Sequence, residues 1–393
     1  MSLLPRKGRV PSAGLFATVL LAACLAACGA EETPSQSEPL RIGIAAQLTG
    51  SAALIGQQSV EGARLAADEI NSLGGILGRQ VVIVPADEAS DPAVGINAIN
   101  KLVFDDKVDV VLGPDTSSVT LATMNITRDE EKLQLTSSLN PTITEQGDEW
   151  IFRLRPTDRI AADLIAQYVV DELGLKRIAV LNSRDDYGQG GADAFVSALK
   201  TRYGLAPVDT ITANTGDTNF VPLLQRVSVA KADGLLLWWS SITEVAKILQ
   251  QRNDVGLKIP IFGSNAMVNS TVVDLATPQL AAGAISATNY ANSNPHPKTV
   301  EFESKFKAAT GKTPNDHASL YYDAVYLLRA AAEQGKGSSS TQLRDGLRAV
   351  KDFCGITSKF SFDAKGEPGN SMLIVRNKAE GGQEVLKAFN YCQ

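Results

Sequence analysis

The sequence predicts an α/β protein made of two doubly wound lobes, and three observations point to this fold. Short apolar runs rich in Val, Leu and Ile alternate with amphipathic helical segments along most of the 393 residues. Several of these runs end in hydroxyl or amide side chains, at the strand ends where open α/β sheets bind ligands. A polar, irregular segment around Arg155 separates the alternation into two similar halves, and the chain is long enough for two domains.

The stretch from Val108 to Thr120 shows the pattern most clearly. Its first five residues are an apolar run typical of a buried parallel strand, and the Gly-Pro pair that follows ends the run. Ser117 and Ser118 then lie where a helix predicted over 119–131 begins, and the positive end of a helix suits a carboxylate. Taken alone, a capping role is the simpler interpretation of these serines; the surrounding pattern favours a ligand role.

The remaining elements follow from the same alternation, which favours parallel sheets with right-handed crossovers. In the first half, strands are expected at 41–46, 80–85, 108–112 and 133–136, with helices at 59–72, 91–106 and 119–131 and a loop at 47–56. In the second half, strands are expected at 177–181, 208–211, 235–239 and 259–262, with helices at 159–173, 191–203, 219–230 and 242–251. The rest of the chain predicts helices at 298–310, 318–333 and 341–350, and strand-like runs at 284–290, 361–363, 372–376 and 384–389.

The amino terminus predicts export. Residues 1–27 combine a basic start with an apolar, small-residue run too short to span a bilayer, which is typical of a secretory signal. Leu-Ala-Ala-Cys occurs twice, ending at Cys24 and Cys28, and resembles a bacterial lipoprotein box. Cys28 is the favoured lipid site because it leaves a longer apolar region and precedes Gly29; Cys24 is the alternative. Residues 28–39 are polar and predict a flexible tether.

Composition excludes several classes of function. The net charge is −6, or −9 without the three basic residues of the signal, and no basic cluster suits nucleic acid. No later apolar stretch is long enough to span a bilayer. The two histidines, His296 and His317, lie in no hydrolase or zinc motif, and there is no phosphate-binding loop. We therefore predict no catalytic residue, metal or cofactor, and an enzyme is the weaker alternative.

Two cysteines remain after the signal, Cys354 and Cys392. An exported protein matures in an oxidising compartment, so a disulfide between them is expected; two free buried thiols are the alternative.

Taken together, several segments resemble the leucine/isoleucine/valine-binding family of type I periplasmic binding proteins. They are the lipoprotein box, RIGIAAQLTGSAALIG, GARLAADEINSLGGILGR, VLGPDTSSVT, DYGQG, GDTNF and SFDAKGE. The resemblance covers about the whole mature chain. It implies an extracytoplasmic, lipid-anchored, monomeric binding protein of an ABC importer, whose partners are a small amino acid, carboxylate or amide, a permease and an ATPase. A ligand-sensing module with the same fold is the alternative.

The resemblance also implies a swapped connectivity through three crossings. Lobe 1 would comprise 40–155, completed by 290–355. Lobe 2 would comprise 156–289, completed by 356–393. A ligand that contacts both lobes would stabilise a closed arrangement and shift the population towards it.

Site residues are implied by the same family. Ser117, with Ser118 beside it, matches the first carboxylate-binding loop, and Ser138 and Asn140 match the second. Tyr187 of DYGQG matches a tyrosine that covers the ligand. A further residue comes from the strand end that contains Trp238 and Trp239; adjacent strand residues face opposite ways, and Trp239 is the one assigned to the cleft.

Two positions depart from the family pattern. Asn265 stands where an acid pairs with the ligand ammonium, and Ile55 stands where an aromatic residue is common. A buried ammonium needs a compensating charge, so we expect a small carboxylate or amide with an apolar part and only a weak requirement for an α-ammonium. Asn265 is also explained as a turn residue. Asp115, Asp158 and Asp186 are alternative partners for a cation, each expected on the solvated surface.

Overall fold

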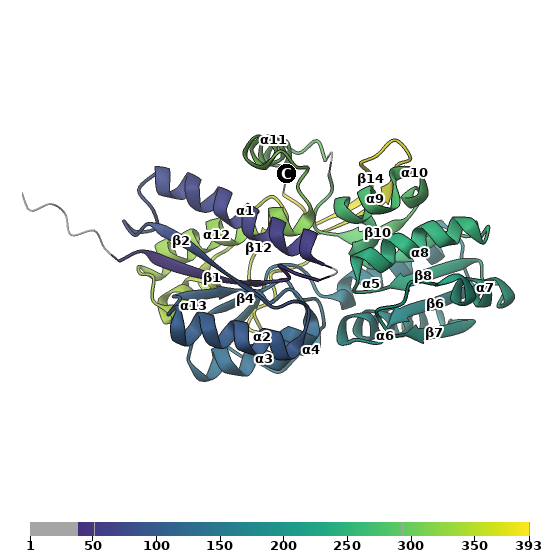
Figure 1. Cartoon of the computed structure of the whole chain (residues 1–393), viewed down its shortest axis with the longest axis horizontal. Coiled ribbons are helices and arrows are strands. Elements are labelled where there is room, and N and C mark those ends of the chain that lie inside the picture. Colours follow the sequence, from purple (N-terminus) through teal and green to yellow (C-terminus); the bar gives the residue numbers. More distant parts are fainter. Residues whose placement is uncertain (1–37, 51, 293, 393) are drawn as a thin grey trace, which may run out of the picture. The chain divides into compact units, whose positions relative to one another are not determined.

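The fold is α/β, with parallel strands forming two sheets in two lobes (Figure 1). The computed structural model describes residues 38–50, 52–292 and 294–392. The predicted signal peptide, Cys24 and the predicted lipid site Cys28 lie outside these residues. No helix in the described part of the chain is both long and apolar enough to cross a bilayer.

The first sheet has five parallel strands in the order β2-β1-β3-β4-β5. Its strands are β1 (Leu40–Ala46), β2 (Val81–Asp87), β3 (Val110–Leu112), β4 (Gln134–Thr136) and β5 (Ile151–Arg153). The chain runs outward from β1 in opposite directions, so the strand order reverses between β1 and β3. Open α/β sheets bind ligands at such a switch point, outside the carboxyl ends of the strands.

Helices from two distant parts of the chain cover the first sheet. They are α1 (Ala53–Ser72), α2 (Pro92–Asn100), the π-helical turn η1 (Lys101–Asp105), α3 (Ser117–Asp129), α4 (Thr142–Glu145), α11 (Pro297–Thr310), α12 (Asp316–Gly335) and α13 (Ser340–Ala349). The apolar faces of α1 and α12 belong to one core with the strands, through residues such as Ala63, Ile70 and Leu328. Helices α12 and α13 therefore pack with the first sheet, although they are distant from its strands in the sequence.

The second sheet has seven strands in the order β14-β13-β10-β9-β8-β6-β7. Its strands are β6 (Ile178–Ser183), β7 (Asp209–Ala213), β8 (Gly234–Trp238), β9 (Ile261–Gly263), β10 (Ile285–Thr288), β13 (Met372–Asn377) and β14 (Gln383–Phe389). The first five are parallel, and the last two add an antiparallel edge. Its helices are α5 (Asp158–Gln167), η2 (Tyr168–Glu172), α6 (Asp186–Tyr203), α7 (Val221–Val229), α8 (Ile242–Asp254), η3 (Asn265–Val268), α9 (Ser270–Ala276) and α10 (Pro278–Ala281).

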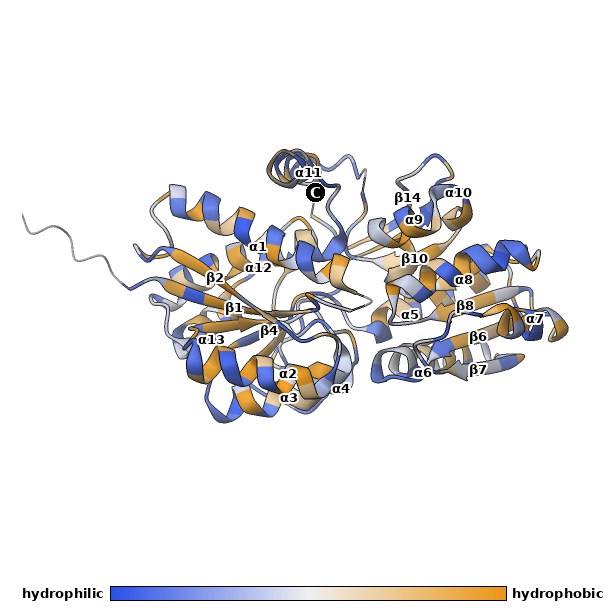
Figure 2. Cartoon of the chain, in the orientation of Figure 1, coloured by the Kyte–Doolittle hydropathy of each residue, from blue (hydrophilic) through white to orange (hydrophobic). Residues whose placement is uncertain are grey.

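Hydropathy explains why the strands lie inside. The strands of both sheets are mainly apolar, whereas the outer helices carry polar residues on one side (Figure 2). In β1 and β8 nearly every side chain is buried, as expected for parallel strands that are covered on both faces. The sheets are therefore rigid supports that hold the loops at their carboxyl ends in place.

The structure differs from the sequence prediction at a few elements. α1 begins at Ala53, inside the predicted loop 47–56, and its first turns bury Ile55 and Gly56. β5 was not predicted, because its apolar run is interrupted by Arg153 and lies next to the polar, irregular segment around Arg155. Residues 361–363 form no strand; instead β11 (Phe353–Cys354) pairs with β12 (Lys359–Phe360). The Cys354–Cys392 disulfide is present in the structure.

Candidate functional site

The candidate site is a cavity where the strand ends of the two lobes face each other. It encloses about 80 Å³. Gln47 follows β1, Ser117 lies just after β3, and Ser240 lies just after β8. All the lining residues are Gln47, Ala52, Ile55, Asp115, Thr116, Ser117, Arg155, Tyr187, Ser240, Ile242, Asn265, Ala266, Asn269 and His317. The carboxyl ends of strands from both sheets therefore face the cavity, and these ends are where open α/β sheets bind ligands.

The start of α3 provides the polar floor of this cavity. Gly113, just before it, has a φ of +93° and lies so close to β1 that a Cβ would be 2.1 Å from the carbonyl oxygen of Ala45. Only glycine fits there. Thr116 is the N-cap residue but makes no side-chain cap, so hydroxyls do not close this helix end. The free N–H groups of the first turn favour an anion.

Ser117 lies in the first turn of α3 and is 1% exposed. Its Oγ accepts a hydrogen bond from the backbone N–H of Asn140 at 3.3 Å. The capping interpretation of Ser117 is therefore wrong: the hydroxyl faces the cavity, and its own proton remains available to donate to an anion.

Three other predicted ligand residues do not line this cavity. Ser118 is half-buried and lies outside the lining. The hydroxyl of Ser138 bonds the carbonyl oxygen of Asp115 at 3.0 Å and lies 2.7 Å from Thr120 Oγ1, so it braces the loops. The side chain of Asn140 donates to the carbonyl oxygen of Asp186 at 2.8 Å, which links the two lobes.

Trp239 does not reach the cleft, and its assignment there is wrong. Its side chain is fully buried in the core of lobe 2, where it packs edge-on against Phe220 with ring centres 5.5 Å apart. The indole Nε1 donates to Glu244 at 2.6 Å. Trp238 faces the opposite core, so both tryptophans stabilise the lobe.

Tyr187 and Asn265 lie together on the lobe 2 wall, as the family pattern implies. The Tyr187 hydroxyl donates to Asn265 Oδ1 at 3.0 Å. The amide nitrogen of Asn265 in turn donates to Asp316 Oδ2 at 2.8 Å. Asn265 is therefore more than a turn residue, because it connects the cavity to an acid at the start of α12.

Asp316 is the centre of a buried charged cluster that the sequence analysis did not identify. Arg155 donates to its Oδ2 at 3.0 Å, and Asn269 donates to its Oδ1 at 2.5 Å. His317 Nδ1 lies 3.1 Å from the same Oδ1. Burial alone would raise the pKa of Asp316, but His317 and Arg155 outweigh it and hold the pKa well below its usual value. Both oxygens of Asp316 are occupied, so it positions its neighbours.

The sequence holds a signal for two single members of this cluster, although not for their grouping. Arg155 lies two residues after the end of β5, and Asp316 is the first residue of α12. Strand ends and helix starts are the positions where this fold places binding side chains. His317 lies in no hydrolase or zinc motif of the sequence, yet it lines the cavity.

The three alternative acids also differ from expectation. Asp115 and Asp158 are buried, 7% and 1% exposed, which contradicts the solvated position predicted for both. Burial raises the pKa of Asp158 to about 7, against the opposing charges of Arg155 and Arg153. Asp186 is exposed, as expected.

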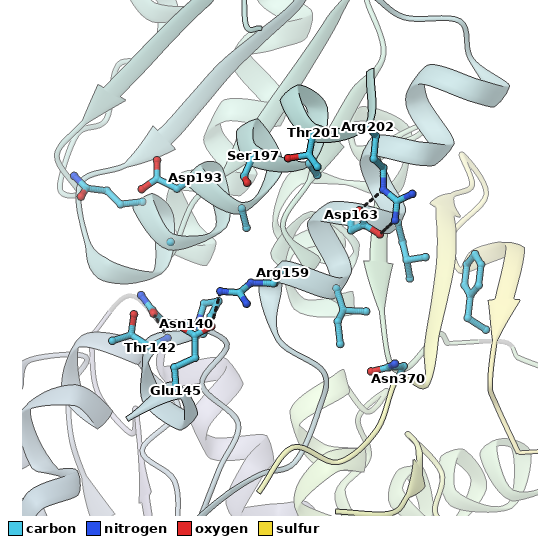
Figure 3. Close-up of a pocket in the computed structure, with 18 of the residues that line it drawn as sticks. Asn140, Thr142, Glu145, Arg159, Asp163, Asp193, Ser197, Thr201, Arg202 and Asn370 are labelled. Atoms are coloured by element: carbon cyan, nitrogen blue, oxygen red, sulfur yellow. Dashed lines mark hydrogen bonds and ion pairs between the residues drawn. The ribbon is translucent and has the colours of Figure 1, made fainter. Parts of the chain in front are cut away.

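A larger cavity of about 1410 Å³ lies elsewhere between the lobes (Figure 3). Asn140, Thr142 and Glu145 line it from lobe 1, and the helices of lobe 2 line it opposite. Its arginines already form ion pairs: Arg159 with Glu145, and Arg202 with Asp163. The paired Arg202 and Asp163 are 44% and 32% exposed, so water competes for this ion pair. The smaller cavity, with its buried polar groups, is the better candidate.

Comparison with known proteins agrees with this fold. The family model described as periplasmic binding protein matches residues 39–383. The chain belongs to this family. Membership implies an exported, periplasmic protein, and the family is one of binding proteins rather than enzymes.

Three individual proteins are similar to this chain over most of its length. The Leu/Ile/Val-binding protein BraC3 of Rhizobium johnstonii is 31% identical over 359 residues, which cover 90% of this chain and 95% of the relative. Leu/Ile/Val-binding protein homolog 2 of Brucella abortus is 28% identical, covering 96% and 99%. The substrate-binding protein LivJ of Streptococcus pneumoniae, solved with isoleucine, has a TM-score of 0.81 and 27% identity, covering 89% and 99%.

Proposed function

We propose that this protein is the substrate-binding component of an ABC importer and binds an amino acid of the branched-chain type, or a related small carboxylate or amide. The observation that carries the proposal is the cavity at the strand ends. It combines the uncapped start of α3 and the Ser117 hydroxyl with apolar side chains from both lobes. A carboxylate fits the helix start, and an apolar body fits the walls.

The walls favour an aliphatic body over an aromatic one. Apart from Tyr187, the apolar lining consists of Ala52, Ile55, Ile242 and Ala266. Trp239, which would have supplied a flat aromatic surface, lies in the core. The names of the relatives, Leu/Ile/Val-binding proteins, support the same ligand class for this chain.

In this function the protein binds and releases its ligand without changing it. The ligand contacts both lobes, which stabilises a closed arrangement that docks on a permease driven by an ATPase. The lobes divide near residue 155 and again near 290 and 355, as the strand order supports. The protein acts as a monomer, held at the cell envelope through lipid on Cys28. Mass spectrometry of the amino-terminal peptide tests the anchor: an unmodified terminus, or lipid on Cys24, contradicts it.

A thermal-shift screen tests the ligand class. L-leucine, L-isoleucine and L-valine should raise the midpoint more than aromatic carboxylates do. A ligand at 100 times its Kd adds about 2.7 kcal/mol to the stability of the native state. Ser117→Ala should reduce the shift. Ser197→Ala, a matched change at an exposed residue of the larger cavity, should not. The proposal fails if none of the amino acids, carboxylates or amides shifts the midpoint, and the larger cavity is the site if only Ser197→Ala reduces the shift.

A further inference from the structure

On the lobe 1 side of the candidate site, two acids and one amide follow the ends of three neighbouring strands. Glu88 follows β2, Gln47 follows β1 and Asp115 follows β3, and these strands are adjacent in the sheet. Gln47 and Asp115 line the cavity, and Glu88 lies directly behind, accepting a hydrogen bond from the Thr116 hydroxyl at 2.9 Å. All three acidic or amide side chains are buried.

Asp115 is a buried acid without a cation. Its Oδ1 accepts hydrogen bonds from the hydroxyls of Tyr321, at 2.5 Å, and Ser137. Its Oδ2 accepts only one, a long bond of 3.3 Å from Ser59. Among the residues the structure describes, no Lys, Arg or His forms an ion pair with Asp115. Buried charges in proteins are generally paired, so a cationic group of a ligand would complete this site.

Gln47 provides a second acceptor in the same place. Its Nε2 donates to Thr116 Oγ1 at 3.0 Å, and the Thr116 proton is directed to Glu88. These two bonds orient the amide and leave Gln47 Oε1 buried without a partner. A buried acceptor without a donor costs free energy, which a ligand N–H group would recover.

The raised pKa of Glu88 agrees with a negative local potential. Burial raises the pKa of Glu88 well above its usual range, and the charge of Asp115 raises it further. A local potential that disfavours the charged form of one acid also favours a ligand cation.

The opposite wall cannot take this role. Asn265 donates its amide to Asp316, and its carbonyl already accepts from Tyr187. The only basic side chains that line the cavity, Arg155 and His317, also contact Asp316. Lobe 2 therefore offers no uncompensated acid at the position where the family has one.

We propose that Asp115 and Gln47 of lobe 1 bind the ammonium group of a zwitterionic ligand whose carboxylate lies at the start of α3. The inference rests on the proposed function and names the ligand class of the same site: an aliphatic α-amino acid, bound through an acid in lobe 1. It replaces the expectation of a weak ammonium requirement, which followed from Asn265 alone.

Calorimetric titration with two matched probes tests this proposal. L-leucine and its deamino analogue 4-methylpentanoate differ only in the ammonium group. The wild-type protein should bind L-leucine at least about tenfold more tightly, a difference of about 1.4 kcal/mol. Asp115→Asn should remove most of this preference by weakening L-leucine while leaving 4-methylpentanoate nearly unchanged. Asp68→Asn removes the same charge from an exposed position of α1 and should preserve the preference.

The outcomes separate the two proposals. If Asp115→Asn retains the preference, or if the wild-type protein binds both probes equally, the ammonium site is wrong while the proposed function stands. If neither probe binds, the proposed ligand class fails, and the ammonium site fails with it. Gln47→Met, which keeps the volume but removes the acceptor, should reduce the preference severalfold. It provides the test if Asp115→Asn does not fold.

Discussion

Asp158→Asn should change how the stability of the protein depends on pH. Asp158 begins α5, is 1% exposed, and its Oδ2 has no hydrogen-bond partner among the described residues. Burial raises its pKa from the usual 3.8 to about 7, although Arg155 and Arg153 oppose the rise. Between these values the folded protein holds a proton that the unfolded chain has released. This proton stabilises the folded state at low pH, and its contribution is lost as the pH rises through about 7.

The size of the effect follows from the same values. A rise from 3.8 to about 7 spans about three pH units, and at about 1.4 kcal/mol per unit it corresponds to about 4 kcal/mol. Asparagine cannot ionise, so Asp158→Asn should escape this loss. We expect the variant to gain stability relative to the wild-type protein as the pH increases from 4.5 to 8.

Urea denaturation at pH 4.5, 6 and 8 measures the difference. Asp323 also has a raised pKa, about 6, caused mainly by burial, so the wild-type curve contains both groups. The difference between Asp158→Asn and wild type isolates Asp158, and Asp68→Asn, which removes the same charge from an exposed position of α1, serves as the control. If the difference for Asp158→Asn is the same at all three pH values, the argument from burial is refuted.

Three further predictions concern individual side-chain interactions. Ser117→Ala should weaken ligand binding by on the order of 1.5–3 kcal/mol, the value of a charge-assisted hydrogen bond. The urea midpoint should change little, because Ser117 is not a cap. A stability loss of about 1 kcal/mol with unchanged affinity would instead indicate a capping role. Trp239→Phe should lower the free energy of unfolding by about 1–3 kcal/mol, because Glu244 loses its buried hydrogen-bond donor. The ligand affinity measured by calorimetry should stay unchanged. Weakened binding with normal stability would place Trp239 in the site. Replacing Cys354 and Cys392 by Ala should cost roughly 2–4 kcal/mol, and two free thiols in the denatured, non-reduced protein would rule out the bond.

The fold could be predicted from the sequence because its signals are local. Apolar strands such as 235–239 and the helices that alternate with them are recognisable in single windows, and the structure has β8 and α8 there. β5 was missed because Arg153 interrupts its short apolar run. The early start of α1 was missed because the packing of Ile55 depends on the rest of the protein. The return of 290–355 to lobe 1 came from the family resemblance alone.

The site could be predicted only in part, for a physical reason. Ser117, Tyr187 and Asn265 line the cavity because strand ends fix their positions. Trp239 was misplaced because two adjacent tryptophans on one strand give no indication of which face is core. The cluster around Asp316 joins residues 155, 265, 269, 316 and 317, and no local pattern relates positions so far apart.

Ligand-driven closure of the two lobes is the central claim, and small-angle X-ray scattering tests it most directly. The radius of gyration of the full mature protein is measured without ligand and at a saturating concentration of L-leucine, with binding established by calorimetry on the same sample. A ligand that contacts both lobes favours the closed arrangement, so the radius of gyration should decrease on saturation. An unchanged radius in a sample that binds L-leucine would contradict closure as the mechanism.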